Sequence, residues 1–207
     1  MVFCVKFESQ VHYQRFMLGA ICGLLPLLCV LFGLFGEVRG INHPGWYNSI
    51  SATYFANSNM CMIGALCLCA FFLFTYKGYD LGDRAYTLVA AVSALLIVAC
   101  PCDAAPMDYI GLFALPAGAS NFIHVVAAIS LFGSFALMTI TQFTRGGHKR
   151  RNTIYRTCGL IMLFCMLVLA VGYFAELPGY MTMICEAAML EAFSFAWIVK
   201  SGILLIK

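Results

Sequence analysis

Long apolar runs without charged residues are the feature that most constrains this chain. Five stretches carry no Asp, Glu, Lys or Arg, and a sixth, mainly apolar segment follows them: residues 16–36, 40–76, 85–102, 109–144, 157–175 and about 177–206. A bilayer core about 30 Å thick needs about 20 apolar residues per helix. The runs therefore predict six transmembrane helices, at about residues 16–36, 56–76, 85–101, 119–144, 157–175 and 180–204.

Composition indicates a chain that lies almost wholly in lipid. Of its 207 residues, 63% are hydrophobic and only 10% are charged, whereas a soluble domain carries about 25% charged residues. We therefore expect an all-α polytopic membrane protein, a bundle of six transmembrane helices that forms a single integral membrane domain over residues 1–207 and contacts membrane lipids. The net charge of +3 then serves as an orientation signal, and no nucleic-acid partner is expected.

The Lys and Arg residues are distributed unevenly about the predicted helices. Eleven of the twelve fall on one side of the membrane and only Arg39 on the other, so the positive-inside rule predicts that both termini are cytoplasmic. The first apolar run is too long for a cleavable signal peptide, and we expect a retained helix in a bacterial inner (plasma) membrane. The basic connection with Arg145, Lys149, Arg150 and Arg151 either sets this topology or binds lipid head groups or an effector.

A few polar groups interrupt the apolar runs, and ionisable side chains inside a membrane are candidates for function because they are costly there. At a rise of 1.5 Å per residue, Ser51, Asp103, His124 and Glu186 lie at similar depths in the outer half. Four further polar residues cluster with Ser51 at the outer end of the second predicted helix: Thr53, Asn57, Ser58 and Asn59. We therefore expect a polar outer-half cavity that binds a lipid head group or a small solute, or relays protons. Three further groups lie just above this level: His43, Asp108 and Glu176.

The same polar groups allow two other interpretations. Carboxylate and imidazole ligands suit zinc, and zinc-bound water is activated near neutral pH, so Asp103, His124 and Glu186 are the candidate ligands of a metal-dependent lipid hydrolase. Paired-ligand spacings such as H-x-x-x-H are absent, and whether the chain is an enzyme stays open. In the other interpretation, His124 and Glu186 are paired polar anchors that fix helix packing.

Glu191 is a separate acidic group near the middle of the last predicted helix. A carboxylate at that depth faces protein or water, or is protonated and hydrogen-bonded. If the protein forms a homo-oligomer around this helix, Glu191 forms a ring as in cation channels. An oligomeric ion channel or membrane effector is therefore a third functional alternative.

Three local patterns predict details of packing and of the connections. Gly19 and Gly23 form a small-xxx-small face, which favours close helix packing within one subunit. The segment 109–116 is too short to span and is expected to lie in the interface or to re-enter the membrane. Cys102 and Cys185, near the outer face, either pair as a disulfide or stay as free thiols.

Short motifs over nearly the whole chain resemble a bacterial family of six-helix membrane proteins of unknown function. These motifs are Ser49-Ile50-Ser51-Ala52-Thr53-Tyr54-Phe55, Tyr76-Lys77-Gly78-Tyr79-Asp80, His124, Arg151-Asn152-x-x-Tyr155-Arg156-x-x-Gly159 and Glu191-Ala192-x-x-x-Ala196-Trp197. The layout is also similar to DRAM-like and Frag1-type six-helix proteins, in which a histidine begins the fourth helix. These resemblances imply the six-helix fold and no defined activity.

A more distant resemblance is to the alkaline ceramidase and adiponectin-receptor group, in which a Ser, an Asp and several His surround zinc. Ser51, Asp103 and His124 are the residues that correspond here, so the resemblance implies a zinc site at these positions. That group has seven helices and an H-x-x-x-H pair, and this chain has neither.

Overall fold

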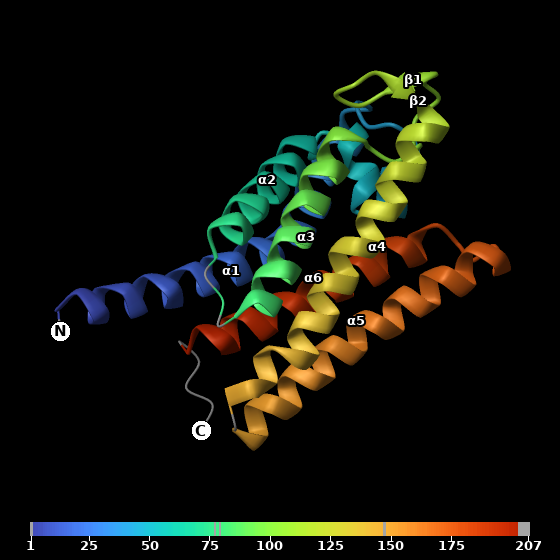
Figure 1. The fold of residues 1–207 in the computed structure, drawn as a ribbon. Coiled ribbons are helices and arrows are strands. Elements are labelled where there is room, and N and C mark those ends of the chain that lie inside the picture. The colour runs from blue at the N-terminus through green and yellow to red at the C-terminus, as the bar shows by residue number, and fades with distance from the viewer. Residues whose placement is uncertain (1, 77, 79, 147, 203–207) are drawn as a thin grey trace.

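The computed structural model describes residues 2–76, 78, 80–146 and 148–202, and for residues 2–9 it describes the backbone alone. Six α helices form most of this part of the chain (Figure 1): α1 Val2–Val38, α2 Asn59–Thr75, α3 Leu81–Ala99, α4 Ala117–Thr141, α5 Lys149–Ala175 and α6 Tyr180–Ser201. Short elements connect them: the 3-10 helices η1 Trp46–Asn48, η2 Ser51–Phe55 and η3 Phe143–Gly146, and the strands β1 Tyr109–Ile110 and β2 Leu115–Pro116. The expected all-α fold is confirmed.

Five helical segments are long and apolar enough to cross a membrane: Gln10–Val38, Leu81–Ala99, Ala117–Gly146, Lys149–Ala175 and Tyr180–Ser201. The remaining helix, α2, is apolar but has only 17 residues. At 1.5 Å per residue it rises about 25 Å, somewhat less than a bilayer core of about 30 Å. The prediction of a helical protein with several helices long and apolar enough to span a membrane is therefore confirmed, and the crossing by α2 stays a prediction.

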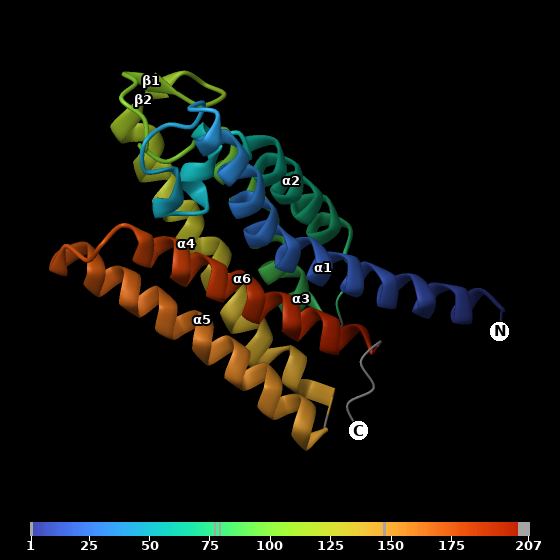
Figure 2. The ribbon, with the colours of Figure 1, turned by 180° about the vertical axis from the view of Figure 1, so that it is seen from behind.

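The helices form a closed ring in chain order. Each helix packs against the helices before and after it, and α6 returns to pack along α1, while α4 also touches α6. The start of α1 and the end of α6 lie at the same end of the bundle (Figures 1 and 2), where His12 Nδ1 lies 2.5 Å from the carbonyl oxygen of Ser201. We call this end the basic end, and the opposite end, which carries β1 and β2, the hairpin end.

Four helices begin earlier than predicted: α3 at Leu81 rather than at residue 85, α4 at Ala117 rather than at residue 119, and α1 and α5 by a larger margin. Helix α1 starts at Val2 rather than at residue 16, and α5 starts at Lys149 rather than at residue 157, so the expected basic connection is largely helical. Charge-free runs mark the part of a helix that lies in lipid, whereas backbone hydrogen bonding continues the helix beyond it. Some of these sequence positions lie outside the described residues: the predicted helix end at 203–204, Lys77, Tyr79 and Lys207.

The strands β1 and β2 form a hairpin over the end of α3. Gly111 turns the chain with φ +79°, and a Cβ atom there would lie 2.5 Å from the carbonyl oxygen of Ala99, so glycine is required. The amide of Leu112 donates to that same carbonyl at 2.8 Å, which satisfies an acceptor at the C-terminus of the helix. The segment 109–116, expected in the interface or as a re-entrant segment, thus closes the end of the bundle.

Close packing of α1 on α6 follows from two glycines. A Cβ atom on Gly19 would lie 2.8 Å from Ile198 Cγ1, and one on Gly23 would lie 2.6 Å from Ser194 Oγ. Larger side chains at these positions would push the helices apart, because small residues are what allow two helix backbones to approach. The predicted small-xxx-small face therefore packs within the chain, as expected.

Candidate functional site

Glu186, in the second turn of α6, reaches the first connection at the hairpin end. The residue is only 8% exposed, and its carboxylate accepts the backbone amide of Ile50 at 2.6 Å and the hydroxyl of Ser51 at 3.2 Å. The amides that begin a helix have no carbonyl partner within it, so the carboxylate supplies the acceptor that η2 lacks. The structure thus brings the predicted Ser51 and Glu186 together, in a contact that anchors the connection to α6.

His124 and Asp103 have different partners. His124 is 4% exposed and its Nδ1 lies 3.0 Å from the carbonyl oxygen of Cys100. Asp103 is exposed, and its backbone amide donates to Asn121 Oδ1 at 3.2 Å. Both contacts hold the segment after α3 against the start of α4. Within the described part of the chain, no hydrogen bond joins either residue to Glu186.

The three candidate zinc ligands therefore do not form a metal-binding group. Among the described residues, no three His, Cys, Asp or Glu side chains lie close enough together to hold a metal ion. Cys102 and Cys185 are both free thiols, so the disulfide alternative is not realised. Burial raises the pKa of the Cys102 thiol to about 12, so this thiol stays protonated at neutral pH.

An open cavity of about 680 Å³ lies at the hairpin end, between the first connection and the segment that precedes β1. Asn42 organises one wall: its Nδ2 donates to the carbonyl oxygen of Gly33 at 2.6 Å, and its Oδ1 accepts the amide of Asn57 at 2.8 Å. The lining residues are Ile41, Asn42, His43, Pro44, Tyr54, Phe55, Ala56, Asn57, Asn59, Ala105, Pro106 and Met107.

The predicted cavity residues are absent from this lining. None of Ser51, Asp103, His124 and Glu186 lines the cavity; its polar groups come instead from residues in or next to the connections. Of these, Asn57 and Asn59 were placed by depth at the predicted level and His43 just above it, whereas Asn42 was not predicted. The pattern Asn42-His43-Pro44-Gly45 is typical of a turn, and a turn signal by itself does not indicate a ligand site.

A second polar cluster, at the basic end, was not predicted. Arg15 of α1 is 7% exposed and Asp83 of α3 is 2% exposed. The Nε of Arg15 donates to the hydroxyl of Tyr76 at 3.2 Å. Lys200 of α6 donates to the carbonyl oxygen of Phe143 at 3.1 Å, and the charges of Arg15, Asp83 and Arg151 all act on its ammonium group.

Aromatic rings fill the space between these charged groups. Trp197 is fully buried and packs edge-on against Tyr76 and Phe143, with both centroid distances at 5.0 Å. Lys200 Nζ lies 5.2 Å from the ring centroid of Phe143 and 5.5 Å from that of Tyr155, within the range of cation–π attraction. Within the described part of the chain, the indole Nε1 of Trp197 has no hydrogen-bond partner.

The sequence held one signal for this cluster. Tyr76, Arg151, Tyr155 and Trp197 all belong to the short motifs of the six-helix resemblance, and the fold brings these distant motifs to one end. Hydropathy alone does not predict the cluster, because charged residues at the ends of apolar runs are expected to lie in water rather than to be buried together.

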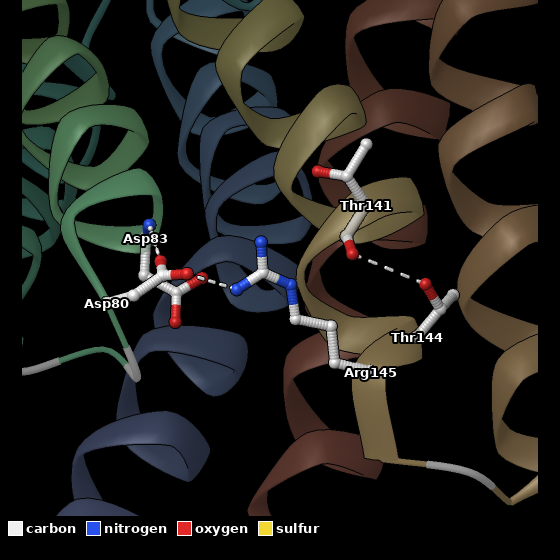
Figure 3. A network of polar contacts seen from close by, with 5 residues as sticks. All are labelled: Asp80, Asp83, Thr141, Thr144 and Arg145. Carbon is white, nitrogen blue, oxygen red and sulfur yellow. Dashed lines mark hydrogen bonds and ion pairs between the residues drawn. The ribbon is translucent and has the colours of Figure 1, made fainter.

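An ion pair at the edge of the basic end joins α3 to η3. Arg145 pairs with Asp80, and both side chains are partly exposed (Figure 3). Asp80 Oδ1 also accepts the amide of Asp83 at 3.0 Å and so caps α3. The hydrogen bond from Arg145 holds the pKa of the Asp80 carboxyl below its usual value. Of the predicted basic connection, Arg145 thus pairs with Asp80, and Lys149 and Arg150 lie at exposed positions in the first turn of α5.

Glu191 is exposed on the surface of α6, close to Gly23 of α1. Its carboxylate makes no hydrogen bond or ion pair within the described part of the chain. A carboxylate exposed in the middle of a helix that is long and apolar enough to span a membrane is unusual, because such groups normally face protein or water.

Comparison with models of known protein families, with curated proteins and with solved structures finds no match to this chain. Function is therefore inferred from the geometry of the two ends of the bundle.

Proposed function

We propose that this chain is a six-crossing membrane protein that binds a lipid head group or a small polar solute in the hairpin-end cavity. The observation that carries the proposal is the cavity itself. Its volume of about 680 Å³ falls within the range of about 300–1,000 Å³ that is typical of small-molecule sites.

The lining favours an uncharged ligand that forms hydrogen bonds. The described residues around the cavity include no Asp, Glu, Lys or Arg, while Asn42, Asn57, Asn59 and His43 contribute amide and imidazole groups that both donate and accept. The side-chain amide of Asn59 has no partner within the described part of the chain and is therefore available to a ligand. Hydroxyl-rich or amide-bearing head groups and solutes match this chemistry.

The proposed membrane placement has α2 as the sixth crossing and both termini on the cytoplasmic side of a bacterial inner membrane. It is supported by the gathering of Lys and Arg at the basic end, where α1 starts and α6 ends. Reporter fusions at the C-terminus and after Arg39 test it. Five proposed crossings, α2 to α6, separate the two fusion points, so the two reporters should lie on opposite sides of the membrane and give opposite signals. Equal signals would contradict this arrangement.

Ligand retention tests the cavity. The protein is released in mild detergent and examined by native mass spectrometry for bound lipid or solute. His43→Ala and Asn59→Ala should each lose most of the retained mass, because each removes a hydrogen-bonding group from the wall. His148→Ala is the matched control, since His148 is exposed at the opposite end. Equal retention in all four proteins, with unchanged circular dichroism, would refute the cavity proposal.

A second candidate function rests on Glu191 alone. Its exposed carboxylate would become buried if a homo-oligomer formed around α6, and a ring of such groups selects cations in channels. Conductance in planar bilayers tests this candidate. Glu191→Gln should change the cation-to-anion permeability ratio, and the absence of any conductance by the unaltered protein removes the channel from consideration.

A further inference from the structure

We propose that the hairpin-end cavity holds an uncharged sugar ring, either as the head group of a glycolipid or as a free sugar. This inference rests on the proposed function, because it uses the same cavity, and it names the class of ligand. The described residues of the lining include no Asp, Glu, Lys or Arg. The ligand class therefore depends on which hydrogen-bonding atoms the fold leaves free and on the rings beside them.

Contacts with the backbone leave two groups of the lining as acceptors. His43 Nδ1 lies 3.0 Å from the carbonyl oxygen of Pro44. A carbonyl oxygen only accepts, so Nδ1 carries the proton, and Nε2 of the neutral imidazole is an acceptor. Asn57 Nδ2 donates to the carbonyl oxygen of Phe32 at 3.3 Å, and Asn57 Oδ1 has no partner within the described part of the chain. Both free acceptors require a donor from the ligand.

Two further groups of the lining can both donate and accept. The Tyr54 hydroxyl and the Asn59 side-chain amide make no hydrogen bond within the described residues, and both residues are half-buried. Tyr54 belongs to η2 and Asn59 begins α2, whereas His43 lies in the first connection. The polar groups are thus spread over successive elements of the wall, and a ligand that meets all of them needs several polar groups of its own.

This set of atoms disfavours the common charged head groups. A phosphate or carboxylate oxygen only accepts, so it would face the acceptors of His43 and Asn57 without a Lys or Arg of the described lining to offset its charge. An ammonium group can donate, but no carboxylate of the described lining would pair with it. A hydroxyl both donates and accepts. Several hydroxyls around one ring therefore satisfy the acceptors and the donors together, whereas a single amide presents its polar atoms at one point.

Aromatic side chains supply the apolar part of the match. Tyr54 and Phe55 both line the cavity, with their ring centroids 5.1 Å apart and their planes at 67°. The hydroxyls of a sugar radiate from the edge of its ring, and its C–H groups form apolar faces that pack against aromatic side chains. The lining thus combines apolar contact with a few hydrogen-bonding groups, as is usual in small-molecule sites.

Exposed apolar side chains favour a glycolipid as the source of the sugar. Ile41 and Met107 line the cavity and are 60% and 54% exposed. The acyl chains of a bound glycolipid would remove such apolar surface from water, whereas a small free sugar would leave much of it exposed. The two sources offer the same ring to the cavity and are separated by experiment.

The test measures lipid retention by the full-length protein in native mass spectrometry. The detergent is a polyoxyethylene ether, because glucoside and maltoside detergents would themselves occupy a sugar site. Glucosyl-diacylglycerol, diacylglycerol and phosphatidylglycerol with identical acyl chains are supplied at equal concentration. The glycolipid should be retained at least about tenfold more than either of the others, as expected for two or more hydrogen bonds that only the sugar makes.

A second arm adds glucose to the complex with glucosyl-diacylglycerol. Displacement of the glycolipid shows that the ring alone is recognised, so a free sugar is also a ligand. Retention in excess glucose shows that the acyl chains contribute to binding, so the ligand is a glycolipid. Both results support the proposal, provided that the protein prefers the glycolipid in the first arm.

Two variants locate the effect. Tyr54→Phe keeps the ring but removes the hydroxyl, and it should reduce glycolipid retention about three- to tenfold. Tyr47→Phe is the matched control, since Tyr47 is an exposed tyrosine of the same connection and lies outside the lining; its effect should stay below about twofold. Asn59→Lys adds a cation to the lining and should shift the preference toward phosphatidylglycerol.

Equal retention of the three lipids, or a preference of the unaltered protein for phosphatidylglycerol, would overturn the sugar assignment. If His43→Ala still reduces that retention, the cavity of the proposed function remains and only the ligand class is wrong. Equal effects of Tyr54→Phe and Tyr47→Phe would also overturn the assignment. Retention of none of the three lipids, without binding of glucose, would refute the sugar assignment as well.

Discussion

The contact between Glu186 and the start of η2 allows a quantitative prediction. Glu186→Ala removes the acceptor of the Ile50 amide, which is bonded at 2.6 Å in a residue only 5% exposed. An orphaned buried donor costs about 1–3 kcal/mol. The Ser51 hydroxyl also loses its acceptor, at a cost of about 1 kcal/mol, because Ser51 is half-buried and water can replace the carboxylate. We therefore expect Glu186→Ala to lower the free energy of unfolding by about 2–4 kcal/mol.

Glu186→Gln separates hydrogen bonding from charge. The amide oxygen of Gln can still accept from Ile50, and its amide nitrogen can donate to the Ser51 hydroxyl, which both donates and accepts. Only the charge-assisted part of each bond is lost, so the expected cost is about 1 kcal/mol. Ligand retention should be unchanged in this variant, because Glu186 does not line the cavity.

The assay is SDS titration in detergent micelles, followed by circular dichroism. Asp108→Ala is the control, since Asp108 is an exposed acid at the same end and its change should fall within about 0.5 kcal/mol. A cost for Gln equal to that for Ala, or a cost below about 0.5 kcal/mol for both variants, would refute the interpretation of Glu186 as a hydrogen-bonded anchor.

Three further predictions concern packing, lipid exposure and pH. Gly33→Ala should lower the free energy of unfolding by about 1–3 kcal/mol, because its Cβ atom would lie 2.2 Å from Cζ3 of Trp46; an unchanged SDS midpoint would contradict this clash. Glu191→Leu should leave stability unchanged or raise it, since an exposed carboxylate is costly in lipid; a marked loss would indicate that a partner binds Glu191. The hydrogen bond from Arg145 lowers the folded-state pKa of the Asp80 carboxyl. The pair therefore stabilises the fold at a pH above the unfolded-state pKa of about 3.9, and this contribution is lost as the pH falls through the folded-state pKa. In unfolding titrations, the Asp80→Asn variant should lose less stability over that acidic range than the unaltered protein.

Hydropathy predicted the helices well because lipid imposes a simple requirement. A buried backbone must satisfy its own hydrogen bonds, which favours a helix over every long apolar run. The same criterion does not detect helical residues outside the bilayer. It therefore missed the helical residues before residue 16 and the start of α5 at Lys149. The hairpin was also missed, because it depends on the turn at Gly111 and its contact with Ala99.

Depth along the chain predicted part of the polar arrangement. Ser51 and Glu186 were placed at one level and do meet. Depth gives no rotation about the helix axis, however, and His124 and Asp103 contact the segments that join α3 to α4. Depth also placed Asn57, Asn59 and His43 at or just above that level. It did not predict the cavity that they line, because the shape of the cavity depends on turn and loop contacts such as that of Asn42 with Gly33.

The amino-acid sequence by itself determined that this chain is helical and apolar enough for a membrane, because composition and run length act locally on each helix. It also predicted a close helix contact at two small residues, Gly19 and Gly23, while the structure identified α6 as the partner. Only the tertiary structure decided which polar groups meet. Closing the ring of helices brings Arg15 near the start of the chain beside Lys200 near its end, and no local pattern encodes a contact between residues so far apart.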